Sequence, residues 1–126
     1  MGTFHHPLEI GNFEGQRFEE VDALVDTGAT YTSVPREVLE RLGVSREEEA
    51  TFILANGQSV RMGMAWVRTR LNGREQPTIV IFGEPGSSVL LGAFTLEGYR
   101  LGVDSVNQRL VETPGYLVGI VLQSRL

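Results

Sequence analysis

The stretch EVDALVDTGATYTSVP, residues 20–35, decides how this chain folds and where its chemistry lies. It begins with a partly alternating, β-like run and passes into the tripeptide Asp26-Thr27-Gly28. An aspartate followed by threonine and glycine at the end of a strand is ordinary turn chemistry, so one interpretation of Asp26 is a turn residue. The other interpretation is a catalytic carboxylate, and the choice between them depends on the rest of the sequence.

Length and charge restrict the class of protein. With 126 residues the chain is expected to form one domain, residues 1–126, so a site that needs two lobes has to come from two chains. A net charge of -5 and a pI near 5.0 provide no basic face, and we expect neither nucleic acid nor a membrane as partner. No apolar run approaches the roughly 18 residues of a membrane span, and no signal-peptide pattern is visible, so the expected location is cytoplasmic.

The missing residue types exclude several chemistries. The sequence has no cysteine and no lysine, which rules out thiol nucleophiles, zinc–thiolate sites, Schiff bases and the Walker lysine. The only histidines, His5 and His6, are adjacent near the N-terminus, where a solvated or strand-edge pair is expected. No metal and no cofactor are therefore expected, and carboxylates remain for bond-breaking chemistry.

Short strands and close turns predict an all-β domain, a small closed β-barrel or sandwich with one or two short helices. The β-like runs are residues 4–10, 17–25, 50–55, 58–71, 75–82, 100–104, 108–112 and 116–122, and residues 89–94 contain a short apolar run that ends at Gly92. A proline, an apolar face and a closing glycine predict a helix over residues 35–43, and residues 95–99 predict one or two further helical turns. Asn56-Gly57 and Asn72-Gly73 each predict a two-residue type I′ hairpin turn. Pro77 places the start of its strand at a sheet edge or a bulge.

Apolar residues precede Asp26, Ala29 follows the tripeptide, and a second short motif, Leu90-Leu91-Gly92, occurs later in the chain. With these surroundings the tripeptide resembles the active-site motif of the single-lobe, retroviral-type (retropepsin-like) aspartic proteases, and in pattern that of their bacterial single-domain members most closely. The order of parts is similar too: a flap hairpin at residues 56–57, a second hairpin, a cleft loop over residues 83–89, and a short helix after Gly92. The resemblance covers about residues 18–100.

The resemblance implies a homodimer that cleaves a polypeptide substrate, with Asp26 as the catalytic residue of each chain. It implies support of the active-site loop by Thr27, Gly28, Leu90, Leu91 and Gly92, with Thr27 buried across the dimer axis. It implies substrate contacts from Gly28, Ala29, Thr30, Leu54, Ala55, Asn56, Gly57, Ser88 and Val89. Thr30 and Ala93 stand where retroviral members usually carry an acidic residue and an arginine, the flap lacks the family's run of glycines, and residues 113–126 form a tail of uncertain role.

Peptide hydrolysis by water explains why two copies are needed. One group has to take the proton of the water and another has to protonate the carbonyl oxygen, and two carboxylates that share one proton supply both. Asp22 is too far along the strand to be that second carboxylate, and Asp104 is expected in a turn.

Two alternatives remain from the sequence. One is a dimerisation or peptide-binding module that keeps the fold without turnover. The other is a monomeric β-barrel for a small ligand, lined by the alternating Met62, Met64 and Trp66, a spacing that is also common in a core.

Overall fold

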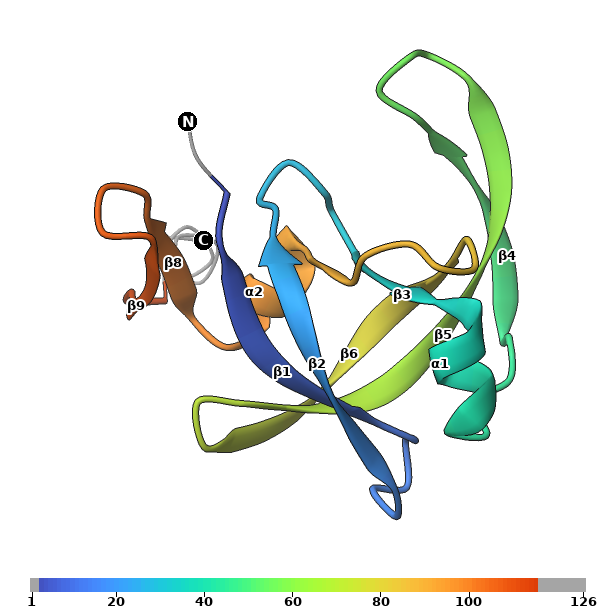
Figure 1. Ribbon diagram of the computed structural model, residues 1–126, viewed down its shortest axis with the longest axis horizontal. Helices are drawn as coiled ribbons and strands as arrows, with labels where there is room; N and C mark the ends of the chain where they lie inside the picture. The colour runs from blue at the N-terminus through green and yellow to red at the C-terminus, as the bar shows by residue number, and fades with distance from the viewer. Residues whose placement is uncertain (1–2, 116–126) are drawn as a thin grey trace, which may run out of the picture.

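A computed structural model describes residues 3–115 of the chain. The strands are β1 (His5–Gly11), β2 (Phe18–Val25), β3 (Thr32–Pro35), β4 (Glu48–Ile53), β5 (Ser59–Leu71), β6 (Arg74–Gly83), β7 (Leu90–Leu91), β8 (Leu101–Asp104) and β9 (Arg109–Glu112), and the helices are α1 (Arg36–Arg41) and α2 (Ala93–Gly98) (Figure 1). The strand expected over residues 116–122 lies outside the described residues.

The main sheet closes on itself. Within residues 3–115 its order is β1-β2-β7-β3-β6-β5-β4, and β1 pairs a second time, with β5. This second pairing joins residues 9–11 of β1 to residues 68–70 of β5, so the sheet becomes a small barrel with the β4–β5 hairpin rising away from it (Figure 1). The prediction of an all-β, closed fold with two short helices is confirmed.

Alternation along β5 separates the core from the surface. Ala65 and Val67 are buried in the barrel, whereas the neighbouring Met62, Met64 and Trp66 point to the outer side and are partly or largely exposed. Successive side chains of a strand face opposite sides of the sheet, so this set cannot line the interior. The monomeric ligand-barrel alternative therefore loses the pocket on which it depended.

The two Asn-Gly pairs form different turns. At Asn72-Gly73 both residues have positive φ, 51° and 79°, and the flanking Leu71 and Arg74 pair directly, which confirms the two-residue type I′ turn.

The two-residue turn predicted at Asn56-Gly57 is wrong. Gly57 has positive φ whereas Asn56 does not. The N–H of Leu54 donates to the carbonyl of Gln58, and the N–H of Gly57 donates to the carbonyl of Leu54, so residues 55–57 form a three-residue loop. The Asn56 side chain accepts a hydrogen bond of 3.0 Å from the N–H of Gln58, which stabilises this longer turn.

The short helix α1 begins one residue later than expected. Pro35 ends β3 and stands just before the helix, so Arg36 is the first helical residue. Gly43, with φ 76°, ends the helix as expected. Pro77 also agrees with its prediction, because β3 pairs only with residues 80–83 of β6 and leaves the proline with a single neighbouring strand.

The β8–β9 hairpin forms a separate two-stranded sheet in the described part of the chain. Asp104 begins its turn, where its carboxylate accepts hydrogen bonds from both the side chain and the backbone N–H of Asn107 and pairs with Arg109. These contacts, with the Asn107 side chain first, lower the pKa of Asp104. The turn role expected for Asp104 agrees with this geometry.

Candidate active site

Asp26 follows directly after β2, at a point where two parallel strands hold the backbone. Leu24 and Val25 of β2 pair with Leu90 and Leu91 of β7, and the N–H of Asp26 donates to the carbonyl of Leu91 over 3.0 Å. The first residue of the loop is therefore fixed by the same apolar pair that the sequence singled out as its support. Leu91 is fully buried, whereas Leu90 is half-buried.

The loop folds back on the Asp26 side chain. The N–H of Gly28 donates to Oδ1 of Asp26 over 3.0 Å, and the N–H of Ala29 donates to the Asp26 carbonyl over 3.1 Å. A Cβ on Gly28 would lie 3.3 Å from Oδ1, so glycine keeps the approach to the carboxylate open. Asp26 is half-buried, and Thr27 and Gly28 are exposed in the single chain.

Gly92 lets the start of α2 dock against the end of this loop. A Cβ there would lie 2.6 Å from both the carbonyl carbon and the oxygen of Tyr31. The next two N–H groups, of Ala93 and Phe94, donate to the carbonyls of Ala29 and Thr30, each over 2.8 Å. The helix start thus satisfies backbone acceptors of the active-site loop, and only a residue without a side chain permits the contact.

Three buried threonine hydroxyls tie the loop to the barrel. Oγ1 of Thr95 on α2 lies 2.6 Å from Oγ1 of Thr32 and 2.8 Å from Oγ1 of Thr78. Thr32 also accepts a hydrogen bond from the N–H of Gly92. Sequence reasoning missed this set, because Thr32 and Thr78 look like ordinary β-formers at strand positions and no local pattern brings Thr95 of α2 to them.

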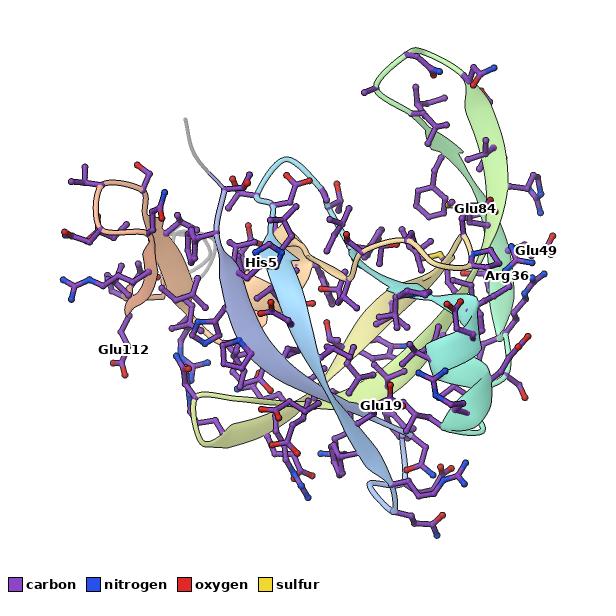
Figure 2. The ribbon with its side chains drawn as sticks, in the orientation of Figure 1. His5, Glu19, Arg36, Glu49, Glu84 and Glu112 are labelled. Atoms are coloured by element: carbon purple, nitrogen blue, oxygen red, sulfur yellow. The ribbon has the colours of Figure 1, made fainter. Side chains whose placement is uncertain are left out.

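The loop over residues 84–89 is anchored by a helix. The carboxylate of Glu37 on α1 accepts a hydrogen bond of 2.9 Å from the N–H of Gly86, while Glu84 begins the loop on the side of the barrel from which the β4–β5 hairpin rises (Figure 2). Ser88 is exposed, as a substrate contact has to be. Val89 is buried in the core of the single chain, and its expected substrate contact stays a prediction.

The expected substrate contacts divide between two places. Residues 28–30 lie in the Asp26 loop, whereas Leu54, Ala55, Asn56 and Gly57 lie at the exposed end of the β4–β5 hairpin (Figure 1). The link between the two is aromatic, because the rings of Tyr31 and Phe52 meet edge to face with centroids 6.3 Å apart. Tyr31 was not predicted as a site residue.

Two hollows are lined in part by residues of β2. One, of about 350 Å³, lies beside Asp26 and is lined by Phe4, Val25, Val103 and the loop itself.

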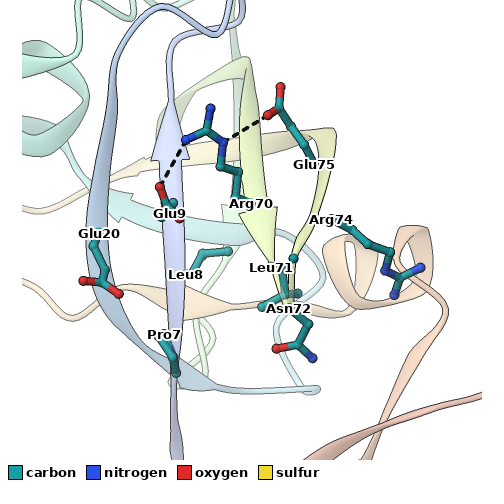
Figure 3. A pocket seen from close by; sticks show the side chains of 10 residues that line it. Pro7, Leu8, Glu9, Glu20, Arg70, Leu71, Asn72, Arg74 and Glu75 are labelled. Carbon is teal, nitrogen blue, oxygen red and sulfur yellow. Dashed lines mark hydrogen bonds and ion pairs between the residues drawn. The ribbon is translucent and has the colours of Figure 1, made fainter.

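The other, of about 360 Å³, lies against β1, β2 and the β5–β6 hairpin, where Arg70 bridges Glu9 and Glu75 (Figure 3). The hydrogen bonds and charges of these carboxylates, with Glu75 first, raise the pKa of Arg70. The charge of Arg70 is therefore matched in this second hollow, whereas Arg74, which also lines it, makes no ion pair within residues 3–115 and donates a hydrogen bond to the carbonyl of Tyr99.

Among residues 3–115, no group of three or more His, Asp or Glu side chains is arranged to hold a metal ion. Neither of the helices in this range has the length and apolar character needed to cross a membrane.

An aspartate in a glycine-containing loop, fixed between parallel strands of a small closed barrel beneath a projecting hairpin, defines the retropepsin-like class of aspartic proteases. The chain belongs to the family described as "gag-polyprotein putative aspartyl protease", whose pattern matches residues 11–97. The match contains Asp26, the hairpin end and Leu90-Leu91-Gly92.

Solved structures support the same fold. The solution structure of Simian Foamy Virus (mac) protease is similar with a TM-score of 0.52 and 22% identity, covering 75% of this chain and 94% of that chain. The structure of a foamy viral protease-reverse transcriptase in complex with an RNA/DNA hybrid is similar with a TM-score of 0.55 and 15% identity, covering 90% of this chain but 13% of that one. No curated protein sequence matches the chain.

Proposed function

We propose that the chain is an aspartic endopeptidase whose active site forms between two copies, each contributing Asp26. The observation that carries the proposal is the state of the Asp26 loop in one chain. Within residues 3–115, the carboxylate accepts one hydrogen bond, from the N–H of Gly28, and makes no ion pair, although the loop around it is fixed on both sides. A single carboxylate on a loop that is fixed on both sides is the arrangement expected if the Asp26 carboxylate of a second chain completes the site.

Two such carboxylates about 3 Å apart cannot both ionise, so the pair holds one proton. The ionised carboxylate takes a proton from a water molecule as the water oxygen attacks the carbonyl carbon of the peptide. The protonated carboxylate gives its proton to the carbonyl oxygen. The tetrahedral intermediate then breaks its C–N bond: the carboxyl that took the proton from water gives it to the nitrogen, and the other carboxylate takes a proton from a hydroxyl of the intermediate. An acid and an amine are released, and the pair again holds one proton.

The surface next to Asp26 supports association with a second copy. Thr27 is exposed in the single chain, and the hollow beside it has apolar walls from Phe4, Val25 and Val103. We infer that the partner's loop covers this surface and buries Thr27 at the twofold axis. A C2 interface is self-complementary, so the same patch serves both chains.

The test is hydrolysis of a peptide library by the parent and by Asp26→Asn. Asparagine keeps the shape and can still accept the hydrogen bond from Gly28, but it cannot carry the shared proton. We expect cleavage to be lost while the circular dichroism spectrum and the dimer remain. The matched control is Asp22→Asn, which changes an exposed strand aspartate and should cleave as the parent does. If the parent cleaves no peptide between acid and neutral pH, the non-catalytic peptide-binding module takes the place of this proposal.

A further inference from the structure

Four aromatic rings form a continuous row from the hairpin to the outer side of the barrel. Tyr31 contacts Phe52 at one end and Phe94 at the other, with the Tyr31 and Phe94 centroids 5.7 Å apart. Phe94 in turn contacts Trp66, with centroids 6.4 Å apart and the rings edge to face. The row therefore joins β4, the Asp26 loop, α2 and β5.

The far end of the row is an exposed apolar groove. Trp66 is 41% exposed and Phe94 39% exposed, which is unusual for two large aromatic side chains in contact. Together with Pro77 and Thr78 they line a hollow of about 480 Å³ between the β5–β6 surface and the outer side of α2. We call these residues the Trp66–Phe94 groove.

Aromatic ring contacts connect the groove with the proposed substrate cleft. Tyr31 lies on the Asp26 loop and touches Phe52 of the flap, so a peptide held between loop and flap leaves the cleft beside Tyr31. The path from Tyr31 to Trp66 consists of the Tyr31–Phe94 and Phe94–Trp66 centroid distances, 5.7 and 6.4 Å. Extended peptide rises about 3.3 Å per residue, so about four residues cover this path. The twofold axis of a homodimer would place one such groove at either end of the cleft.

Charge indicates the kind of peptide. In the described part of the chain, Glu97 is the one charged side chain that lines the groove. Glu47 lies next to it, because its carboxylate accepts a hydrogen bond of 3.2 Å from the N–H of Trp66. An apolar hollow with carboxylates on two sides suits a large apolar side chain with a neighbouring arginine or lysine, whose cation can also lie over the exposed indole.

We propose that the Trp66–Phe94 groove is a remote substrate subsite, which takes a large apolar residue flanked by basic residues about four positions beyond Tyr31. This inference rests on the proposed protease function. The groove would select substrates by a second part of the peptide, outside the residues that surround the scissile bond.

The first experiment measures cleavage. An eight-residue peptide that the parent cleaves is lengthened by Arg-Leu-Arg at each end, and versions with Glu-Leu-Glu or Gly-Gly-Gly serve as controls. We expect Arg-Leu-Arg to raise kcat/KM about fivefold over Gly-Gly-Gly, the effect of burying roughly half of one leucine side chain in an open groove. Glu-Leu-Glu should gain less. In Trp66→Ala the advantage should disappear, and in Trp66→Phe, which keeps an aromatic wall, most of it should remain.

Val106→Ala is the control variant, because Val106 is 89% exposed in the β8–β9 turn and lies outside the groove. It should keep the full preference for Arg-Leu-Arg. Equal kcat/KM for all three lengthened peptides in the parent would overturn the subsite while leaving the protease function intact. A preference that survives in Trp66→Ala would overturn it as well.

The second experiment does not depend on cleavage. Trp66 is the single tryptophan of the chain, so its fluorescence reports on the groove alone. Adding Gly-Gly-Arg-Leu-Arg-Gly-Gly to full-length Asp26→Asn should shift its emission to shorter wavelength, whereas Gly-Gly-Glu-Leu-Glu-Gly-Gly should do so weakly. If this shift occurs in Asp26→Asn and the parent cleaves no peptide, the groove is supported as a peptide site and the protease function is overturned.

Other occupants of the groove give different signals. An emission that is already blue-shifted without peptide, and unchanged on dilution, would assign the groove to another segment of the same chain. A blue shift that fades on dilution would assign it to a second copy. Either result overturns the proposal, as does an emission that no peptide changes.

Discussion

The carboxylate of Glu37 holds the N–H of Gly86 at 2.9 Å, so a side chain of α1 fixes the tip of the loop between β6 and β7. The rest of that tip is exposed, and Gly86 has a φ of 78°. Hydrogen bonds from the N–H of Glu37 itself and then from Gly86 lower the pKa of the Glu37 carboxyl below its ordinary 4.5. The bond therefore contributes fully above pH 4.5 and is lost as the pH falls through the lowered value.

The first prediction is that this loop loosens in acid. If the loop borders the cleft, the KM of the parent should rise as the pH falls through the lowered pKa of Glu37, because the protonated carboxyl holds Gly86 less strongly. In Glu37→Gln the amide oxygen accepts the same hydrogen bond at every pH, so KM should show no such rise. Glu37→Ala should have a raised KM throughout. The measurement is KM against pH for the three proteins, and identical profiles for parent and Glu37→Gln would contradict the prediction.

The second prediction concerns the buried threonines. Thr95→Val keeps the volume of the side chain but removes the hydroxyl that lies between Thr32 and Thr78, and leaves both of these with an unmatched hydrogen-bonding group. We expect the free energy of unfolding to fall by about 1–3 kcal/mol. Denaturant unfolding measures it, and Thr51→Val, at an exposed position, should change stability by less than about 0.5 kcal/mol. Equal effects at the two positions would remove the hydroxyl cluster as a stabilising element.

The third prediction is that Gly92→Ala destabilises the protein and impairs the site together. A methyl group 2.6 Å from the backbone of Tyr31 cannot be accommodated unless α2 moves away from the Asp26 loop. Overpacking of this kind costs about 1–3 kcal/mol. Gly98→Ala is the control, since its methyl group would meet the end of the Gln76 side chain at 3.6 Å, an ordinary contact. A thermal scan that finds both variants alike would show that the close approach at Gly92 is not needed.

The fourth prediction treats the β4–β5 hairpin as a flap. Ile53 is 69% exposed and Leu54 38% exposed at its end, whereas Phe52, the residue before Ile53, packs on Tyr31. Such an end has few contacts to lose when it opens, and it gains them when a peptide lies beneath it. Amide hydrogen exchange over residues 52–60 should slow when a statine-type inhibitor binds. Protection that appears only at other residues would move the cleft elsewhere.

Sequence patterns predicted the fold well wherever a local rule acted alone. Asn72-Gly73 became the type I′ turn that its residues favour, and Gly43 ended α1. Asn56-Gly57 is the same dipeptide in a different turn, because the register of β4 with β5 leaves three residues to connect and the Asn56 side chain stabilises that longer loop. The dipeptide determines which turn type is locally preferred, whereas the register of the two flanking strands determines which turn type forms.

The candidate site divides in a similar way. Asp26, Gly28 and Gly92 could be found from the sequence, since a tripeptide motif and a glycine requirement are short-range signals. Glu37 and Tyr31 could not, because each acts through a contact with a residue far along the chain, namely Gly86 and Phe94. Pairings of that range depend on the closed sheet, which brings β7 and α2 against the Asp26 loop, and no local pattern specifies them.

The last prediction tests whether two chains share one site. When Asp26→Asn chains are mixed with parent chains at constant total concentration and allowed to exchange, parent pairs form in proportion to the square of the parent fraction. An equal mixture should therefore keep about a quarter of the activity, if a pair with one asparagine cannot hold the shared proton. A site complete within one chain would keep about half. The measurement is the initial rate of peptide cleavage against the fraction of variant, and Asp22→Asn in place of Asp26→Asn should leave the rate constant across the series. A linear fall with Asp26→Asn would show that each chain works alone and would reject the shared dyad, even if the chain proves to be a protease.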